Sequence, residues 1–248
     1  MTDAKLIAGN WKMHGLVSEV GRLAKYAAMA DQAAAHVRTA IAVPHTMIFA
    51  AAQLAAGSRL QIGGEDCHHS DAGAHTGCVS AAMLKDAGAS FTILGHSERR
   101  TDQGESDGDV RAKAEAALAA GLDVIICVGE TEAERDAGQA EGVVGEQLAG
   151  SVPDGVDAAR LTIAYEPVWA IGTGKTATAV DVAVMHDHIR AALVSRFGDA
   201  GQGILILYGG SMKAANAEQL LATSNVGGGL VGGASLKAED FAPIIAAC

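Results

Sequence analysis

The chain has 248 residues, of which 49% are hydrophobic and 19% charged, which is ample for a large core and too apolar for a disordered protein. A formal net charge of −11 without basic clusters argues against nucleic acid as a partner. No apolar run reaches the roughly 20 residues of a membrane span, no signal-peptide pattern precedes the first strand-like segment, and the four cysteines lack CxxC spacing. We therefore expect a cytoplasmic protein with free thiols and no membrane contact.

Eight short apolar segments are the candidate strands. They lie at Lys5–Asn10, Thr39–Val43, Leu60–Gly64, Phe91–Leu94, Val124–Val128, Thr162–Glu166, Ile204–Tyr208 and Gly229–Val231. Their apolar residues run on without clear alternation, which is typical of strands buried on both faces.

Helical patterns lie between the strands. The clearest cover Val17–Ala30, Asp109–Ala120, Val180–Arg196 and Ala214–Ala222. Strand starts recur every roughly 20 to 45 residues, which is the spacing of βαβ units. Eight such units without a linker predict an α/β protein, a single-domain (β/α)₈ TIM barrel over residues 1–248. An open doubly wound sheet is the alternative, and strand count alone does not exclude it.

In either architecture, ligands bind at the carboxyl ends of the strands. The polar residues that end or follow the candidate strands are therefore the candidate site. They are Asn10, Lys12, Glu65, Asp66, His96, Glu130, Glu166 and Ser211. The pattern predicts that all of them lie on one face of the fold.

Three of these residues suggest acid–base chemistry. Glu166 closes an apolar strand, where desolvation raises the pKa and basicity of a carboxylate; a rim carboxylate in a salt bridge is the alternative. His96 lies at an expected helix start, where the helix dipole favours a neutral ring able to donate to a carbonyl; a capping histidine is the alternative. Lys12 can stabilise a phosphate or an enolate oxygen, unless it is an ordinary surface lysine.

Two glycine-rich segments follow the last two candidate strands: Tyr208–Ser211 and Leu230–Ser235. Successive glycines let backbone N–H groups converge on an anion, and barrels often bind phosphate after strands seven and eight. Two tight turns are the alternative. The apolar, glycine-containing stretch Pro167–Lys175 is predicted to be a lid over the ligand, or else a loop packed permanently on its barrel.

Five segments carry a resemblance to a known family. Ala-Gly-Asn-Trp-Lys-Met, Leu-Gly-His-Ser-Glu-Arg-Arg, Ala-Tyr-Glu-Pro-Val-Trp-Ala-Ile-Gly-Thr-Gly-Lys, Tyr-Gly-Gly-Ser and Leu-Val-Gly-Gly-Ala-Ser-Leu resemble the signature segments of triosephosphate isomerases. They occur in that family's order from Ala8 to Leu236. The resemblance implies interconversion of dihydroxyacetone phosphate and D-glyceraldehyde 3-phosphate through an enediolate, without a cofactor, in glycolysis and gluconeogenesis.

The resemblance also implies a role for each matching residue. Glu166 is the base, His96 the electrophile and Lys12 the electrostatic stabiliser. Asn10 and Glu98 lie beside that lysine. The residues that match the family's phosphate-binding backbone are Gly172, Ser211, Gly232 and Gly233.

The resemblance further implies a homodimer, because the stretch Gly73–Ser80 matches a loop that reaches into a partner subunit. Three positions depart from the family's pattern, namely Glu65, Cys78 and Gly227. None is catalytic, so we expect them to affect local stability and not activity.

Neither of two groups of histidines suggests a metal site. The spacing of His68, His69 and His75 with Asp71 fits no common zinc pattern, and His186 and His188, two apart on a helix, face different directions. We therefore expect no bound metal.

Two rival functions remain at this stage. Another phosphate-binding barrel, acting on a different sugar phosphate or an indole precursor, would explain the glycine loops but not the His96 and Glu166 segments. A catalytically inactive barrel kept as a binding protein is the other. The presence of Glu166, His96 and Lys12 favours the enzyme.

Overall fold

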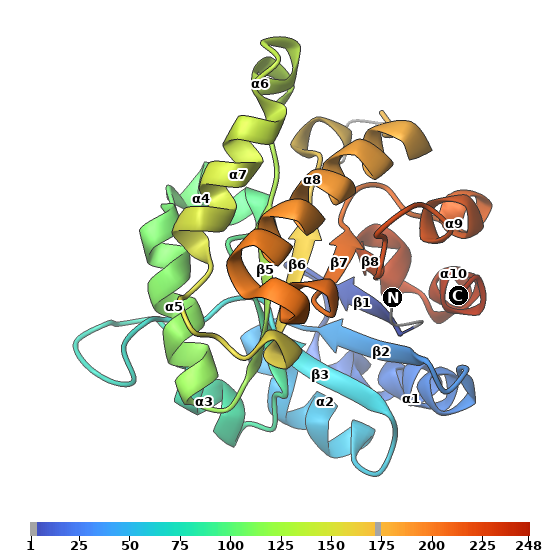
Figure 1. Cartoon of the computed structure of the whole chain (residues 1–248). Coiled ribbons are helices and arrows are strands. Elements are labelled where there is room, and N and C mark those ends of the chain that lie inside the picture. Colours follow the sequence, from blue (N-terminus) through green and yellow to red (C-terminus); the bar gives the residue numbers. More distant parts are fainter. Residues whose placement is uncertain (1–3, 172–174) are drawn as a thin grey trace.

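The fold is a closed barrel of eight parallel strands (Figure 1). The computed structural model describes residues 4–171 and 175–248. Each strand pairs with the next, and β8 pairs with β1 to close the ring. The strands are β1 (Lys5–Asn10), β2 (Val37–Ala42), β3 (Leu60–Gly64), β4 (Phe91–Leu94), β5 (Asp123–Val128), β6 (Leu161–Tyr165), β7 (Leu205–Tyr208) and β8 (Gly228–Val231). The predicted TIM barrel is confirmed, and the open sheet is excluded.

Helices surround the barrel on the outside (Figure 1). They are α1 (Leu23–Gln32), α2 (Ile48–Ala55), α3 (Ala81–Asp86), α4 (Ser97–Gln103), α5 (Asp107–Ala119), α6 (Glu132–Asp136), α7 (Ala140–Ser151), α8 (Ala179–Phe197), α9 (Ala214–Leu221) and α10 (Ala238–Ala246). No helix among these described residues is long and apolar enough to cross a membrane.

One predicted helix is wrong in its first part. The segment expected as a helix over Val17–Ala30 begins as a 3₁₀ turn over Val17–Arg22, and α1 starts only at Leu23. Gly21 lies within that turn and disfavours a continuous α-helix. The first turn of the segment is also largely exposed, so tertiary packing does not compensate for the glycine.

Apolar side chains form two separate layers. Inside the barrel, small and branched residues such as Ala8, Ala42, Ile93 and Leu207 fill the space between the strands. A larger cluster packs the outer faces of the strands against the helices. Burial on both faces explains why the strand sequences are apolar throughout.

Gly227 and Cys78, two of the departures from the family pattern, occupy very different places. Gly227 joins two strands at the start of β8, since its N–H donates to Ile206 O (2.8 Å) and its C=O accepts from Leu6 N (3.0 Å). Cys78 is a free, exposed thiol on the loop between β3 and α3. Their effect on stability stays a prediction.

A histidine buried between the strands and the outer helices makes the free energy of unfolding depend on pH. His186 on α8 is fully buried, with Nδ1 3.2 Å from Asn225 O, and burial lowers its pKa to about 4. The unfolded chain binds a proton there below about pH 6.5, while the folded chain stays neutral down to about pH 4. We expect the free energy of unfolding to fall by on the order of 2 to 3 kcal/mol as pH drops through this window.

Urea unfolding at pH 7 and pH 4, followed by circular dichroism, measures this loss. His186→Gln should show a smaller loss on acidification than the parent. The control is His36→Gln at an exposed site before β2, which should match the parent. An equal acid loss in parent and His186→Gln would contradict the assignment.

Candidate active site

Residues from five strand ends and the loops after them, those of β1, β4, β6, β7 and β8, line one cavity at the carboxyl end of the barrel. Its volume is about 360 Å³. The predicted residues Asn10, Lys12, His96, Glu98, Glu166, Ser211, Gly232 and Gly233 all line it. Gly172 lies outside the described residues.

Glu166 follows β6 directly, and its backbone N–H donates to Val128 O (2.8 Å). Its side chain is buried. Oε2 accepts from the N–H of Ser97 (2.9 Å), and Oε1 lies 2.8 Å from His96 Nε2. Burial acts to raise the pKa of Glu166, but His96 and the Ser97 N–H outweigh it, so that this pKa is lowered.

The expectation of a raised Glu166 pKa is therefore wrong for this arrangement. The sequence indicates burial, but it does not show the donors that the fold places around the carboxylate. A lowered pKa keeps Glu166 ionised at neutral pH. When the Glu166 carboxylate moves away from Ser97 N–H and His96, its pKa rises again, and it becomes a stronger base toward a ligand.

His96 caps α4, the helix that its position predicted. Its Nδ1 accepts the N–H of Glu98 (3.2 Å), while Nε2 faces the Glu166 carboxylate. A neutral ring with its proton on Nε2 fits both contacts, an assignment that rests on the hydrogen-bond pattern. Burial acts to lower the pKa of His96, but the adjacent carboxylate prevails and raises it. That influence weakens when Glu166 moves away, so neutrality during the reaction stays a prediction.

Lys12 lies just past β1 in a left-handed conformation, with φ 55°. Its N–H donates to Asn10 Oδ1 (3.1 Å), and its Nζ lies 2.5 Å from Glu98 Oε1. Side chains other than glycine adopt this backbone conformation at a cost of roughly 1 to 3 kcal/mol. Asn10 and Glu98 thus lie beside Lys12, as the resemblance implied.

The two glycine segments meet across the same cavity. Ser211 follows β7, and Gly232 and Gly233 follow β8, where a short 3₁₀ helix begins at Gly233. The first N–H groups of a helix lack partners within it, which suits an anion. Gly210 allows a tight turn, since a Cβ there would lie 2.2 Å from Tyr208 Oη.

Of the predicted lid, the structure describes both ends. Val168–Ala170 form a 3₁₀ turn, Ile171 lines the cavity, and Lys175 is ion-paired with Glu132. Residues 172–174 lie outside the described residues. Closure over a ligand stays a prediction.

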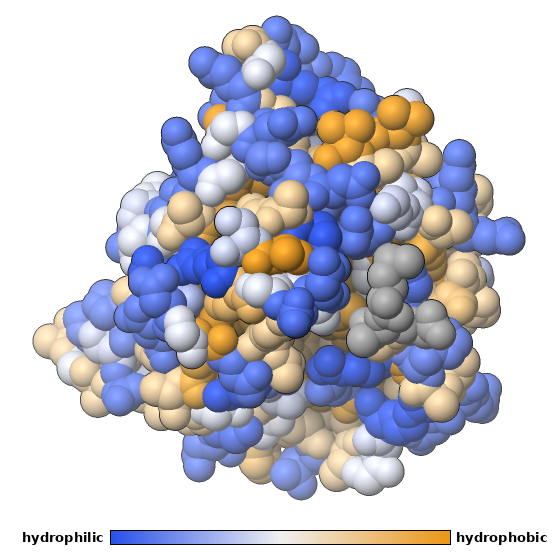
Figure 2. Space-filling view, in the orientation of Figure 1, coloured by the Kyte–Doolittle hydropathy of each residue, from blue (hydrophilic) through white to orange (hydrophobic). Residues whose placement is uncertain are grey.

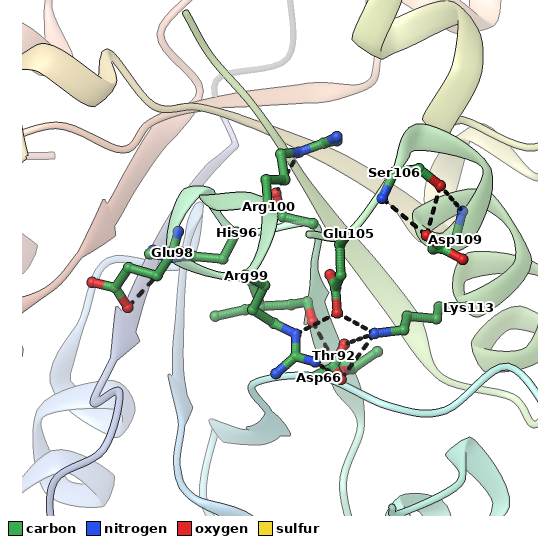
Figure 3. A network of polar contacts seen from close by, with 12 residues as sticks. Asp66, Thr92, His96, Glu98, Arg99, Arg100, Glu105, Ser106, Asp109 and Lys113 are labelled. Atoms are coloured by element: carbon green, nitrogen blue, oxygen red, sulfur yellow. Dashed lines mark hydrogen bonds and ion pairs between the residues drawn. The ribbon is translucent and has the colours of Figure 1, made fainter. Parts of the chain in front are cut away.

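Glu130 and Asp66, two polar residues at strand ends, do not line the main cavity. Glu130 is fully buried; its Oε1 accepts from Tyr165 Oη (3.1 Å) and Trp169 Nε1 (2.8 Å), which anchors the loop after β6. Asp66 belongs to a charged network outside the barrel (Figure 3). Both residues lie at the carboxyl ends of the strands, as predicted. Their contacts stabilise the surrounding loops and helices and do not line the main cavity.

The network in Figure 3 ties the end of β3 to α4 and α5. Asp66 contacts Lys113 Nζ (2.9 Å) and Arg99 Nη2 (2.9 Å), and Arg99 Nε donates to Glu105 (2.6 Å). Lys113 also pairs with Glu105. Opposite charges compensate one another in this largely buried place. The network therefore fixes α4, the helix that His96 caps and that begins at Ser97.

Glu65 borders a second hollow, of about 320 Å³, beside Lys12. Its Oε1 is buried, without a hydrogen-bond partner among the described residues. Burial raises the pKa of Glu65 to about 8. A carboxyl group in this state destabilises the fold whenever it is charged.

Three histidine rings on the loop after β3 contact one another, and those of His68 and His69 are stacked. The ring centroids of His68 lie 4.3 Å from His69 and 4.0 Å from His75. Within residues 4–171 and 175–248, no group of three or more His, Cys, Asp or Glu side chains is arranged to hold a metal ion.

Ser97 is a site residue that sequence reasoning missed. Its N–H and hydroxyl both face the Glu166 carboxylate, at 2.9 and 3.4 Å. Its position after the helix-capping His96 was a usable signal, because the first residues of a helix offer free N–H groups to an anion.

The barrel and this cavity together define the class of protein. A buried carboxylate in contact with an imidazole, a nearby lysine and two glycine segments at the carboxyl ends of β7 and β8 suit a (β/α)₈-barrel enzyme that transfers protons on a phosphorylated ligand.

Comparison with known proteins identifies the family. The sequence profile described as triosephosphate isomerase matches residues 5–248. Triosephosphate isomerase of Afipia carboxidovorans is 58% identical over 98% of this chain and 97% of its own length, and that of Ruegeria pomeroyi is 56% identical over 98% and 96%. The crystal structure of triosephosphate isomerase from Bartonella henselae superposes with a TM-score of 0.92 at 48% identity, covering 98% of both chains. The chain belongs to the triosephosphate isomerase family and is an isomerase.

Proposed function

We propose that this chain interconverts dihydroxyacetone phosphate and D-glyceraldehyde 3-phosphate, a step of glycolysis and gluconeogenesis. The observation that carries the proposal is the meeting of Glu166, His96 and Lys12 in one cavity with the glycine segments after β7 and β8. The four free cysteines suit a reducing compartment, and we place the reaction in the cytoplasm.

The chemistry follows from the positions of these groups. The substrate phosphate binds to the backbone at Ser211, Gly232 and Gly233. Glu166 removes a proton from C1, and His96 Nε2–H donates to the adjacent oxygen. Negative charge that develops on the oxygens is stabilised by the Lys12 ammonium. Transfer of the hydroxyl proton from the C1 oxygen to the C2 oxygen, next to His96, and return of the abstracted proton to C2 give the aldose. Only protons move, so the reaction needs no external electron carrier.

Glu166 has to change partners for this reaction. In the present arrangement its carboxylate accepts from Ser97 N and contacts His96 Nε2. Substrate then competes for both His96 and Glu166, which frees the carboxylate to approach C1. The Ser97 N–H thus stabilises a resting position of the base.

A coupled assay tests the activity. The purified chain is supplied with D-glyceraldehyde 3-phosphate, and glycerol-phosphate dehydrogenase reports the ketose through NADH oxidation. Turnover supports the proposal. Absence of turnover, or turnover only with a larger sugar phosphate, would replace it by one of the rival functions.

We further propose a homodimer. Five exposed apolar side chains lie on the loops and helices that follow β1, β2 and β3: Met13, Leu16, Val17, Phe49 and Met83. The loop that contains Gly73–Ser80, which leads into α3, stands away from the barrel (Figure 1). A second copy would bury these side chains and place its own loop in the hollow beside Glu65 and Lys12, with the same patch used by both subunits.

Phe49→Asp tests this interface. A charge at a buried aromatic anchor should weaken dimerisation by at least about 30-fold, since such anchors commonly contribute 2 kcal/mol or more. Analytical ultracentrifugation of parent and variant at micromolar concentration measures it. Val184→Asp is the control, because Val184 is exposed on α8, and Figure 2 shows an apolar patch over the start of that helix. This variant should remain dimeric. A parent that is monomeric and active would reject the homodimer.

A further inference from the structure

We propose that Gln147 on α7 is a positioning residue for the base Glu166, acting through Gly129. This inference rests on the proposed function, because it assigns Glu166 the role of the base. Gln147 does not touch the main cavity. Its influence runs through two backbone segments that lie side by side.

The side-chain amide of Gln147 forms hydrogen bonds with both backbone groups of Gly129, as a neighbouring strand would. Its Oε1 accepts the N–H of Gly129 (2.7 Å), and its Nε2 donates to the C=O of Gly129 (3.1 Å). β4 ends at Leu94, opposite Ile126, so no strand of the described part of the chain pairs with Gly129 on that side. A side-chain amide that bonds both groups of one residue reproduces the pairing of a neighbouring strand.

Gly129 in turn abuts the backbone of Glu166. A Cβ on Gly129 would lie 1.7 Å from Glu166 O and 2.7 Å from its carbonyl carbon. On either side, Glu166 N donates to Val128 O (2.8 Å) and Val168 N donates to Glu130 O (3.1 Å). The segment that Gln147 holds is therefore bonded to the base and to the residue where the following loop begins.

Packing alone does not fix this region. A cavity of about 90 Å³ lies behind Glu166, and Gly129, Gln147, Ser97 and Val168 all help to line it. A cavity leaves its lining short of contact partners on one side. The two hydrogen bonds of Gln147 thus oppose a shift of Gly129 that the packing would allow.

A small shift of this backbone would matter for the reaction. The Glu166 carboxylate meets Ser97 N at 2.9 Å and His96 Nε2 at 2.8 Å. Displacement by about 1 Å from a reactive geometry can reduce a rate by about 100-fold. Displacement also weakens the contacts that lower the pKa of Glu166.

The experiment compares Gln147→Met with Glu146→Met. Methionine keeps the length and helix propensity of Gln147 but removes both hydrogen bonds. Glu146 is the exposed neighbour on the same helix and serves as the matched control. We expect Gln147→Met to lower kcat by about 10- to 100-fold, with KM within about threefold. The acid limb of kcat/KM, which reports the free enzyme, should move to higher pH.

Carbon-13 NMR of the Glu166 carboxyl group provides a second readout that does not depend on turnover. Its titration should move upward in Gln147→Met and stay unchanged in Glu146→Met. If the parent does not turn over triose phosphates, the proposed function fails, and this titration still decides whether Gln147 positions Glu166.

Gln147→Asn guards against a simple loss of folding. It keeps the amide on a side chain one methylene shorter and adds no charge near Glu166, so the two bonds to Gly129 are weakened and not replaced by a repulsion. We expect kcat and the NMR titration to fall between those of the parent and Gln147→Met. If the methionine variant does not fold, this variant alone makes the comparison. An unchanged titration and acid limb in a folded Gln147 variant, whatever its kcat, would overturn the proposal and leave Gln147 with a structural role only.

Discussion

Glu166→Gln is expected to lower kcat by about 10² to 10⁴, because a positioned general base commonly contributes that much. The amide keeps the shape of the side chain and cannot accept a proton from C1. KM should change far less, since the glycine segments and Lys12 that hold the substrate stay in place. Steady-state kinetics in both directions of the isomerisation measure the two constants.

Glu218→Gln is the control for this substitution. It makes the same chemical change on an exposed face of α9 and should leave both constants unchanged. If kcat of Glu166→Gln stayed within about twofold of the parent value, instead of falling by the expected factor, another group would have to be the base.

Glu65→Gln is expected to stabilise the protein in neutral and alkaline solution. The raised pKa of Glu65, about 8, means that the folded chain holds a proton which the unfolded chain releases near pH 4.5. The free energy of unfolding therefore falls as pH rises from about 4.5 to about 8. The variant removes this loss, with a gain on the order of 4 to 5 kcal/mol at pH 9 and little change at pH 4.

Melting temperatures of parent and variant at pH 4, 7 and 9 test the expectation. Glu115→Gln on the exposed side of α5 provides the control and should show no pH-dependent gain. Equal shifts at all three pH values would show that Glu65 does not titrate in this range.

Most of the barrel could be predicted from the sequence. The strands are buried on both faces, so each is a short apolar run between helical stretches, and β1, β3 and β4 have the predicted bounds. The short helices α3, α4 and α6 carry no comparable pattern. Each has seven residues or fewer, and caps such as Ser80 and Thr131 begin them more clearly than any apolar stripe.

The site was predictable as a set of residues and not as a set of contacts. The rule that ligands bind at the carboxyl ends of strands places Glu166, His96 and Lys12 together. It does not say that the Ser97 N–H meets the Glu166 carboxylate, and that contact helps to reverse the expected pKa shift. Gln147 was beyond prediction, because it bonds only backbone groups of Gly129, 18 residues away.

The left-handed backbone at Lys12 is strained, because lysine, unlike asparagine at Asn225, has no short polar side chain that suits this conformation. With φ at 55°, a glycine would fit this position better than lysine does. Selection for heat resistance alone would therefore favour loss of the ammonium group, while selection for turnover keeps it. At Lys12, thermal stability and catalytic activity are therefore opposed. Engineering for a higher melting temperature alone would select a stable barrel that has lost the Lys12 ammonium group.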